Sequence, residues 1–316
     1  MLKLHSGTNL GQKFLCHRTR GIAHLLHKKS KILLCENEIY AIEKPVNVLS
    51  HPNQTGDEKK SIINGSYNHR KERFEICPTI GGPNEFVYLI NRLDSATSGI
   101  ILMTTNETIA KLVKTLFAKR MIIKIYKAIV FSDVKIGAGE KTMVWEDAME
   151  INKVNGFNRA QQCKQPSRSG MCALTQVAIT DTQLYSLGRS KLSGSDMMLL
   201  ELRPKTGYTH QLRYQCALHL FPIVGDKTYG NFKLNKSTEL VARTIGINSK
   251  VKNCQNDQDQ NLEKLDVHST ADHKRLYLHS YSVEFKYHYS GETFTFKAIS
   301  KLPEEFLQII DNSYNC

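Results

Sequence analysis

The sequence lacks the signatures of several protein classes. Among its 316 residues, no stretch approaches the ~20 consecutive apolar residues that span a bilayer, so the sequence does not indicate an integral membrane protein. Its 8 cysteines are scattered without a CxxC pair, which argues against a structural zinc site and fits reduced thiols better than a disulfide framework. With 8 prolines and 19 glycines, the chain is neither collagen-like nor of low complexity. Its length allows one or two folded domains.

Motifs for common cofactors are also missing. The sequence contains no GxxxxGK[ST] phosphate loop, no GxGxxG after an expected strand, no HExxH and no GxSxG. We therefore expect an enzyme built on this chain to work with side chains alone, without a cofactor or a metal.

Positive charge is what the sequence has in excess. Lysine and arginine total 43 against 30 aspartates and glutamates, a formal net charge of +13. This balance favours a polyanionic partner, and RNA or DNA comes before a membrane surface because no amphipathic anchor stands out. Residues 1–30 form a basic leader without a single acid. An RNA-binding arm, a solvated terminus and a mitochondrial address remain alternatives for it. We expect a monomer in the cytoplasm, with the mitochondrial matrix as the alternative compartment.

Short apolar runs predict more strands than helices. The expected strands are 32–34, 39–42, 86–90, 99–103, 121–130, 143–151, 174–180, 197–202, 281–287 and 293–299. Because they do not alternate regularly with helices, the pattern predicts an α+β fold with a mixed or antiparallel central sheet flanked by helices.

Two helices and two polar excursions complete the expected organisation. Apolar spacing predicts a helix over 106–119, with a capping box formed by Thr104 and Glu107, and a shorter helix over 210–220 capped by Thr209. Polar residues predict surface excursions over 53–73 and 252–261, within a single domain that covers 31–316.

Two polar segments carry candidate chemistry. Residues 91–102 read NRLDSATSGIIL and place Asp94 between an arginine and small hydroxyl residues. Taken alone, a turn with Gly99 at an unusual φ is the better explanation. Residues 205–213 read KTGYTHQLR, and FPIVGDKTYG follows at 221–230; taken alone, these are a capped surface helix and a glycine-rich turn.

Together the segments resemble the RluA-type RNA pseudouridine synthases. The hallmark H-R-L-D-x-x-T-S-G is matched over 92–99, G-R-T-H-Q-[IL]-R over 207–213, and P-I-x-G-D-x-x-Y-G over 222–230. The family's K-x-Y, N-K-P and R-x-x-L-H elements correspond to 124–126, 43–45 and 275–279. The resemblance spans about 32–306 and implies the pseudouridine synthase catalytic fold. Three positions depart from the family pattern: Asn91 for His, Tyr208 for Arg and Glu43 for Asn.

The resemblance implies an RNA pseudouridine synthase that isomerises uridine in structured rRNA or tRNA without a cofactor. Asp94 would be the catalytic carboxylate, and Arg213 would keep it ionised in a poorly hydrated site. Tyr126 would stack on the target base and help to remove its C5 proton.

Four further residues are implied as RNA contacts or as supports of the catalytic residues: Arg92, Lys124, His210 and Gln211. For His210 and Gln211, hydrogen bonding that only shapes the loop is an equal alternative.

Two rival functions are weaker. A catalytically silent RNA-binding or RNA-folding protein on the same fold predicts damage at Asp94, Tyr126 or Arg213, and all three are intact. A glycosidase that releases the base normally needs a second carboxylate and a placed water, and no second acid lies near Asp94 in the sequence.

Overall fold

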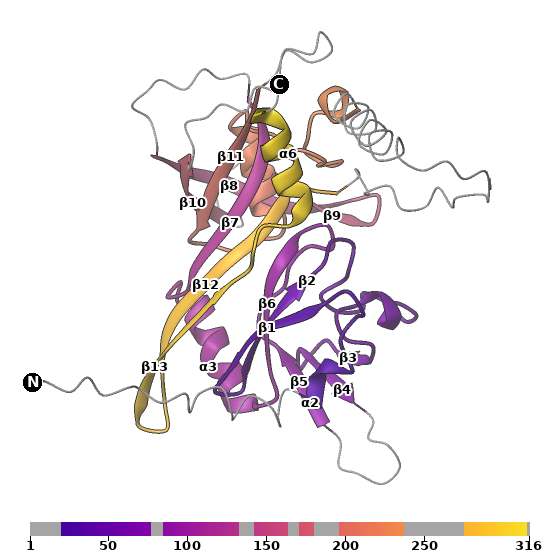
Figure 1. The fold of residues 1–316 in the computed structure, drawn as a ribbon, viewed down its shortest axis with the longest axis vertical. Coiled ribbons are helices and arrows are strands. Elements are labelled where there is room, and N and C mark those ends of the chain that lie inside the picture. The colour runs from indigo at the N-terminus through magenta and orange to yellow at the C-terminus, as the bar shows by residue number, and fades with distance from the viewer. Residues whose placement is uncertain are drawn as a thin grey trace, which may run out of the picture. The chain divides into compact units, whose positions relative to one another are not determined.

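The computed structural model describes residues 20–76, 85–132, 142–163, 171–179, 196–236 and 275–314 (Figure 1). The chain folds into two compact units. Unit 1 comprises Met1–Ile123 and Ser282–Ser300, and unit 2 comprises Lys124–Tyr281 and Lys301–Cys316.

Antiparallel strands form the frame of unit 1. The pairs are β1 with β2, β2 with β6, β6 with β5, β5 with β4, and β4 with β3, and a hairpin of β12 and β13 adds to them. The strands are β1 (Lys31–Glu36), β2 (Ile39–Lys44), β3 (Ser66–Asn68), β4 (Arg73–Ile76), β5 (Glu85–Leu89), β6 (Ser98–Thr104), β12 (Leu278–Tyr289) and β13 (Glu292–Ile299). Within the described residues of this unit, the helical elements are α2 (Arg20–Ala23), the 3₁₀ helix η1 (Glu58–Lys60) and α3 (Glu107–Ala118).

Strand β6 is the centre of unit 1 because both of its faces are buried. Ile100 and Leu102 pack into one core cluster, while Ile101 and Met103 pack into another, as the alternation of side chains along a strand requires. The first cluster is completed by the apolar face of α3 and by the β12–β13 hairpin. Asp94 lies just before β6, so the turn that carries it is anchored to the best-packed strand of the unit.

Helix α3 confirms the expected helix over 106–119, but its expected capping box is wrong. The N-cap is Asn106, whose side chain accepts hydrogen bonds from the backbone N–H groups of Thr108 and Ile109. Thr104 is instead the last residue of β6, and its Oγ1 accepts from the backbone N–H of Asn106. The strand continues to Thr104 because β2 and β5 both pair there, and this long-range pairing decides where the helix begins.

Unit 2 is built on a second set of antiparallel strands in the order β7–β11–β10–β8–β9. They are β7 (Ile123–Ser132), β8 (Thr142–Val154), β9 (Phe157–Gln162), β10 (Met171–Ile179) and β11 (Asp196–Pro204). The described helical residues of this unit include α4 (Gln211–Leu218), α6 (Glu304–Tyr314) and residues 232–236. Arg275 is 4% exposed and donates from Nη1 to Glu305 Oε2 at 2.9 Å, which docks α6 onto the unit (Figure 1).

All ten expected strands are present, with ends displaced by no more than three residues. The α+β prediction is confirmed, since strands predominate and no regular alternation with helices occurs in the described parts of the chain. Strands β3, β4 and β9 and helix α6 were not expected. The excursion over 252–261 lies outside the described residues.

Two expectations about polar segments need correction. Residues 53–73 are an ordered part of unit 1, because Ile62 and Ile63 are fully buried in its core. The expected leader is not separate over 20–30 either: Ile22 is 2% exposed, and the backbone N–H of His27 donates to Ile62 O at 2.8 Å. None of the described helices is long and apolar enough to cross a membrane.

Candidate active site

Asp94 lies at the start of a tight turn between β5 and β6. The backbone N–H of Thr97 donates to Asp94 O at 3.0 Å, which closes the turn, and the Asp94 side chain is half-buried. Gly99 follows with φ +109°, a conformation that side chains disfavour, as the sequence predicts.

A fully buried lysine fixes the chain beside Asp94. Lys44 is 0% exposed, and its Nζ donates to three carbonyl oxygens: Ser95 O at 3.0 Å, Val48 O at 2.7 Å and Pro45 O at 2.9 Å. An ammonium has three donors, so this geometry gives each of them an acceptor. The sequence signal for this role is a lysine at the end of an apolar strand directly before a proline, and the motif comparison alone did not assign Lys44 a function.

The residue on the other side of Asp94 is held as well. Ser50 Oγ donates to Leu93 O at 2.7 Å and accepts from the Leu93 backbone N–H at 3.0 Å. Lys44 and Ser50 therefore fix the backbone on both sides of the carboxylate, so Asp94 is presented from a rigid segment.

The residues that depart from the family pattern have defined contacts. Asn91 Oδ1 accepts from the Leu102 backbone N–H at 2.7 Å, and Glu43 Oε1 accepts from Ser300 Oγ at 2.8 Å. Tyr208 packs against the small apolar cluster of Met149, Ala160 and Ala173 in unit 2. Each of the three side chains thus contributes to the stability of its own unit.

Arg213 forms a two-pronged ion pair with Asp226. Arg213 Nε and Nη2 donate to the two carboxylate oxygens of Asp226, both at 2.8 Å, and the residues are 8% and 2% exposed. The backbone N–H groups of Thr228 and Tyr229 donate to the same carboxylate at 2.8 and 3.0 Å. Sequence reasoning missed Asp226, although it belongs to the matched G-D-x-x-Y-G element.

The environment of Asp226 keeps its carboxylate charged. Burial alone would raise its pKa, but the hydrogen bonds and charge of Arg213, together with the two backbone N–H donors, hold the pKa below its ordinary value. Gly225 makes this arrangement possible: its φ is +77°, and a Cβ there would collide with Arg275 O. Asp226 is therefore a fixed anion that orients the guanidinium of Arg213.

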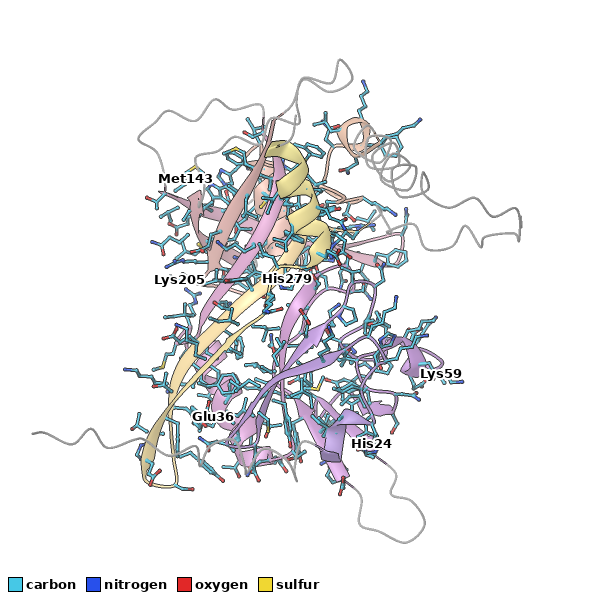
Figure 2. The ribbon with its side chains drawn as sticks, viewed as in Figure 1. His24, Glu36, Lys59, Met143, Lys205 and His279 are labelled. Carbon is cyan, nitrogen blue, oxygen red and sulfur yellow. The ribbon has the colours of Figure 1, made fainter. Side chains whose placement is uncertain are left out.

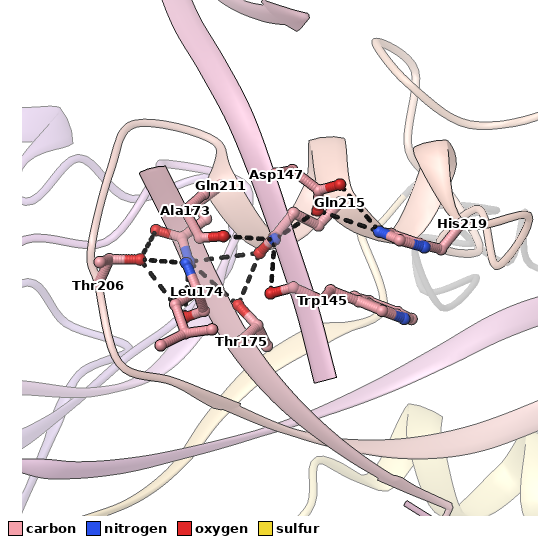
Figure 3. A network of polar contacts seen from close by, with 9 residues as sticks. All are labelled: Trp145, Asp147, Ala173, Leu174, Thr175, Thr206, Gln211, Gln215 and His219. Carbon is pink, nitrogen blue, oxygen red and sulfur yellow. Dashed lines mark hydrogen bonds and ion pairs between the residues drawn. The ribbon is translucent and has the colours of Figure 1, made fainter. Parts of the chain in front are cut away.

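A buried polar network attaches α4, the helix that carries Arg213, to β10 and β8 (Figure 3). Gln211 is 3% exposed; its Oε1 accepts from Thr206 Oγ1 at 2.8 Å and its Nε2 donates to Thr175 Oγ1 at 3.0 Å. Gln215 accepts from Thr175 Oγ1 at 2.6 Å and donates to Asp147 Oδ2 at 2.7 Å. In these contacts Gln211 fixes the loop and the helix start, which is one of its two expected roles.

The network ends at a histidine that also stacks on the protein's only tryptophan. His219 Nε2 lies 3.0 Å from Asp147 Oδ2, and its ring stacks on Trp145 with centroids 4.6 Å apart. Both ends of α4 are thereby held against the same pair of strands.

Lys124 and His210 make polar contacts near the start of α4. Lys124 Nζ donates to Thr206 O at 2.9 Å, and burial, reinforced by the charge of Lys205, lowers its pKa to about 8. His210, not the expected Thr209, is the N-cap of α4; it has φ 58° and no side-chain capping bond, and its Nδ1 lies 3.0 Å from Tyr229 OH. Figure 2 labels Lys205, the residue whose charge reinforces the lowering of the Lys124 pKa.

Tyr126 and Arg92 complete the expected site residues. Tyr126 lies on β7 opposite Leu202 of β11 and is half-buried. Arg92 is exposed, and its Nη1 lies 3.4 Å from His51 Nε2. Asp94 and Arg92 belong to unit 1 and the other candidates to unit 2, so their roles in one reaction remain predictions from the resemblance. The described residues contain no group of three or more metal-binding side chains.

Comparison with known proteins identifies the family. The family model described as RNA pseudouridylate synthase matches residues 38–218, which include Asp94, Tyr126 and Arg213. The chain belongs to this family. The buried Lys44 beside Asp94 also lies within the residues that match the pseudouridylate synthase family model.

Individual relatives agree with this assignment. The chain is 30% identical to tRNA pseudouridine synthase C of Yersinia pestis over 208 residues, 65% of this chain and 72% of that protein. It is 26% identical to the protein of the same name from Pectobacterium carotovorum over 180 residues, 56% of this chain but only 46% of that protein. Among solved structures, Human RNA Pseudouridylate Synthase Domain Containing 4 aligns over 90% of this chain and 92% of its own, with a TM-score of 0.54 and 21% identity, which supports the fold.

Proposed function

We propose that the protein isomerises uridine to pseudouridine in structured RNA, with Asp94 as the catalytic carboxylate. The observation that carries the proposal is the Asp94 turn, clamped by Lys44 and Ser50, within a chain that belongs to the RNA pseudouridylate synthase family. Since the relatives from Yersinia and Pectobacterium are named tRNA pseudouridine synthases, tRNA is the first substrate to test, ahead of rRNA.

The reaction balances without a co-reactant. The C1′–N1 bond breaks, the uracil turns, C5 bonds to C1′, the C5 proton is lost and N1 gains one. Asp94 can attack C1′ directly or remove a sugar proton to give a glycal, and either route needs it ionised. By the same resemblance, we assign Arg213, which Asp226 orients, to the catalytic residues, and Tyr126 to assist removal of the C5 proton.

The substrate must leave its stack to reach the carboxylate. Extruding a base costs a few kcal/mol, and contacts from lysine and arginine to the RNA backbone offset that cost. The formal net charge of +13 is suited to such contacts.

The test combines three measurements on transcribed tRNA and rRNA fragments. Release of tritium from RNA labelled at uridine C5 reports isomerisation, liquid chromatography reports any free uracil, and fluorescence anisotropy reports RNA affinity. We expect tritium release by the native protein, none by Asp94→Asn, and equal affinity for both. The matched control is Glu292→Gln, which removes an exposed carboxylate of the same unit and should keep full activity.

The rival functions give different results. Binding without tritium release in any RNA indicates a silent RNA-binding protein, and free uracil indicates a glycosidase. Normal turnover by Asp94→Asn removes Asp94 from the mechanism.

A further inference from the structure

Four side chains of unit 1 form an aromatic and basic cluster. The His51 cluster consists of His51, Tyr67, His69 and Arg92. The rings of His51 and Tyr67 stack in parallel, with centroids 4.7 Å apart and an interplanar angle of 7°. His69 meets both rings edge-on, at 5.2 Å from His51 and 5.1 Å from Tyr67.

The inner part of the cluster is firmly held. Tyr67, on β3, packs against the fully buried Phe74 of β4 at 4.8 Å. His51 Nδ1 lies 2.9 Å from Pro52 O, and its Nε2 lies 3.4 Å from Arg92 Nη1. Burial, with nearby Arg92 and His69, lowers the pKa of His51, so its neutral ring can donate to Pro52 and accept from Arg92. The stacked pair is therefore a rigid base for the residues outside it.

The outer part of the cluster is exposed and positively charged. His69 and Arg92 are exposed, and so are Arg70 and Lys71 in the turn after β3. The acid of this turn, Glu72, is paired with Lys114, whose Nζ lies 2.6 Å from Glu72 Oε2. Lys59 also projects from this unit (Figure 2). Exposed rings beside cations are the combination that binds single-stranded nucleic acid, where bases stack on rings and phosphates meet the cations.

We propose that the His51 cluster is a binding subsite for an unpaired RNA nucleotide next to the target uridine, with its base on His69 and its phosphate on Arg92 and the basic turn. Arg92 is two residues from Asp94 in the rigid turn segment, which links the subsite to the proposed catalytic carboxylate. The inference rests on the proposed function for the identity of the RNA, but its binding test does not require turnover.

The experiment measures the affinity of RNA stem–loops with a loop uridine, by fluorescence anisotropy, in the full chain. One RNA has an intact loop, and others lack the base of a single nucleotide beside the uridine. The variants are His69→Ala, His69→Phe, which keeps a flat ring, and the control His288→Ala, an exposed histidine on β12.

We expect His69→Ala to weaken binding roughly 5- to 100-fold, the effect of one lost base–ring stack, and His69→Phe to restore most of it. One of the base-lacking RNAs should weaken binding by the native protein to a similar extent. It should cause no further loss in His69→Ala, because the stack is already absent. His288→Ala should bind like the native protein.

Other outcomes overturn the proposal. Equal affinity of His69→Ala and the native protein excludes the stack, as does a native protein that fails to bind the stem–loops at low salt. An equal loss of RNA affinity in His69→Ala and His69→Phe would show that His69 acts through hydrogen bonding, which also contradicts stacking. Failure of the proposed function appears differently, as intact RNA binding with no tritium release from any substrate.

Discussion

Removal of the negative charge at Asp226 tests how the structure holds Arg213. In Asp226→Asn, the buried guanidinium loses its charged partner, and an amide offers only one acceptor atom to a fork that uses two. Breaking a buried ion pair by changing one partner costs about 3–5 kcal/mol of unfolding free energy. We expect a loss of unfolding free energy in this range at neutral pH. Turnover should fall more than RNA affinity, because the variant disturbs Arg213, a proposed catalytic residue.

Urea unfolding provides the assay because Trp145 is the only tryptophan and lies 3% exposed in unit 2, the unit that contains Asp226. The matched control is Glu304→Gln, which changes an exposed carboxylate of the same unit 2. Loss of an exposed charge should change the unfolding free energy by only about 0–1 kcal/mol.

The pH dependence adds a second, independent check. The folded state lowers the pKa of Asp226, so its contribution to stability is fully present above the ordinary aspartate value of ~3.9 and is lost as the pH falls through the folded pKa. The stability difference between the native protein and Asp226→Asn should therefore be constant from pH 7 to 5 and narrow below about pH 4. A difference below 1 kcal/mol, or one that does not change with pH, would refute the argument.

Three further predictions concern Arg213, Lys44 and the start of the chain. Arg213→Lys should lower tritium release by orders of magnitude with little change in RNA affinity, because an ammonium cannot make the two-pronged contact; normal turnover with weak binding would instead make Arg213 a phosphate contact. Lys44→Met should lower the unfolding free energy by about 3 kcal/mol or more, since three carbonyls lose their donor. It should also reduce turnover by loosening the Asp94 turn, whereas the exposed control Lys286→Met of the same unit should change neither quantity. Deletion of residues 1–19, which spares the buried Ile22, removes three basic residues. If these residues bind phosphates, the slope of log affinity against log salt should flatten by up to roughly three units. An unchanged slope would favour a solvated terminus or a mitochondrial address.

Local pattern was enough to predict most of the elements of this protein. The continuous apolar run in β6 and the i, i+3, i+4 spacing in α3 are properties of consecutive residues, and both elements form where the pattern places them. The same holds for Gly99, whose positive φ the sequence predicts from its place directly after a turn. The candidate residues Asp94, Tyr126 and Arg213 came from motif order, which is also read along the chain.

What only the tertiary structure decided are contacts between distant residues. The ammonium of Lys44 reaches Ser95, 51 positions away, and no spacing in the sequence indicates that pairing. Ile62 and Ile63 lie in a run too polar to predict burial, yet they fill the core of unit 1. In each case the decisive free energy comes from satisfying a buried donor or removing an apolar side chain from water. Both depend on which segments the fold brings together, and not on the residues next in sequence.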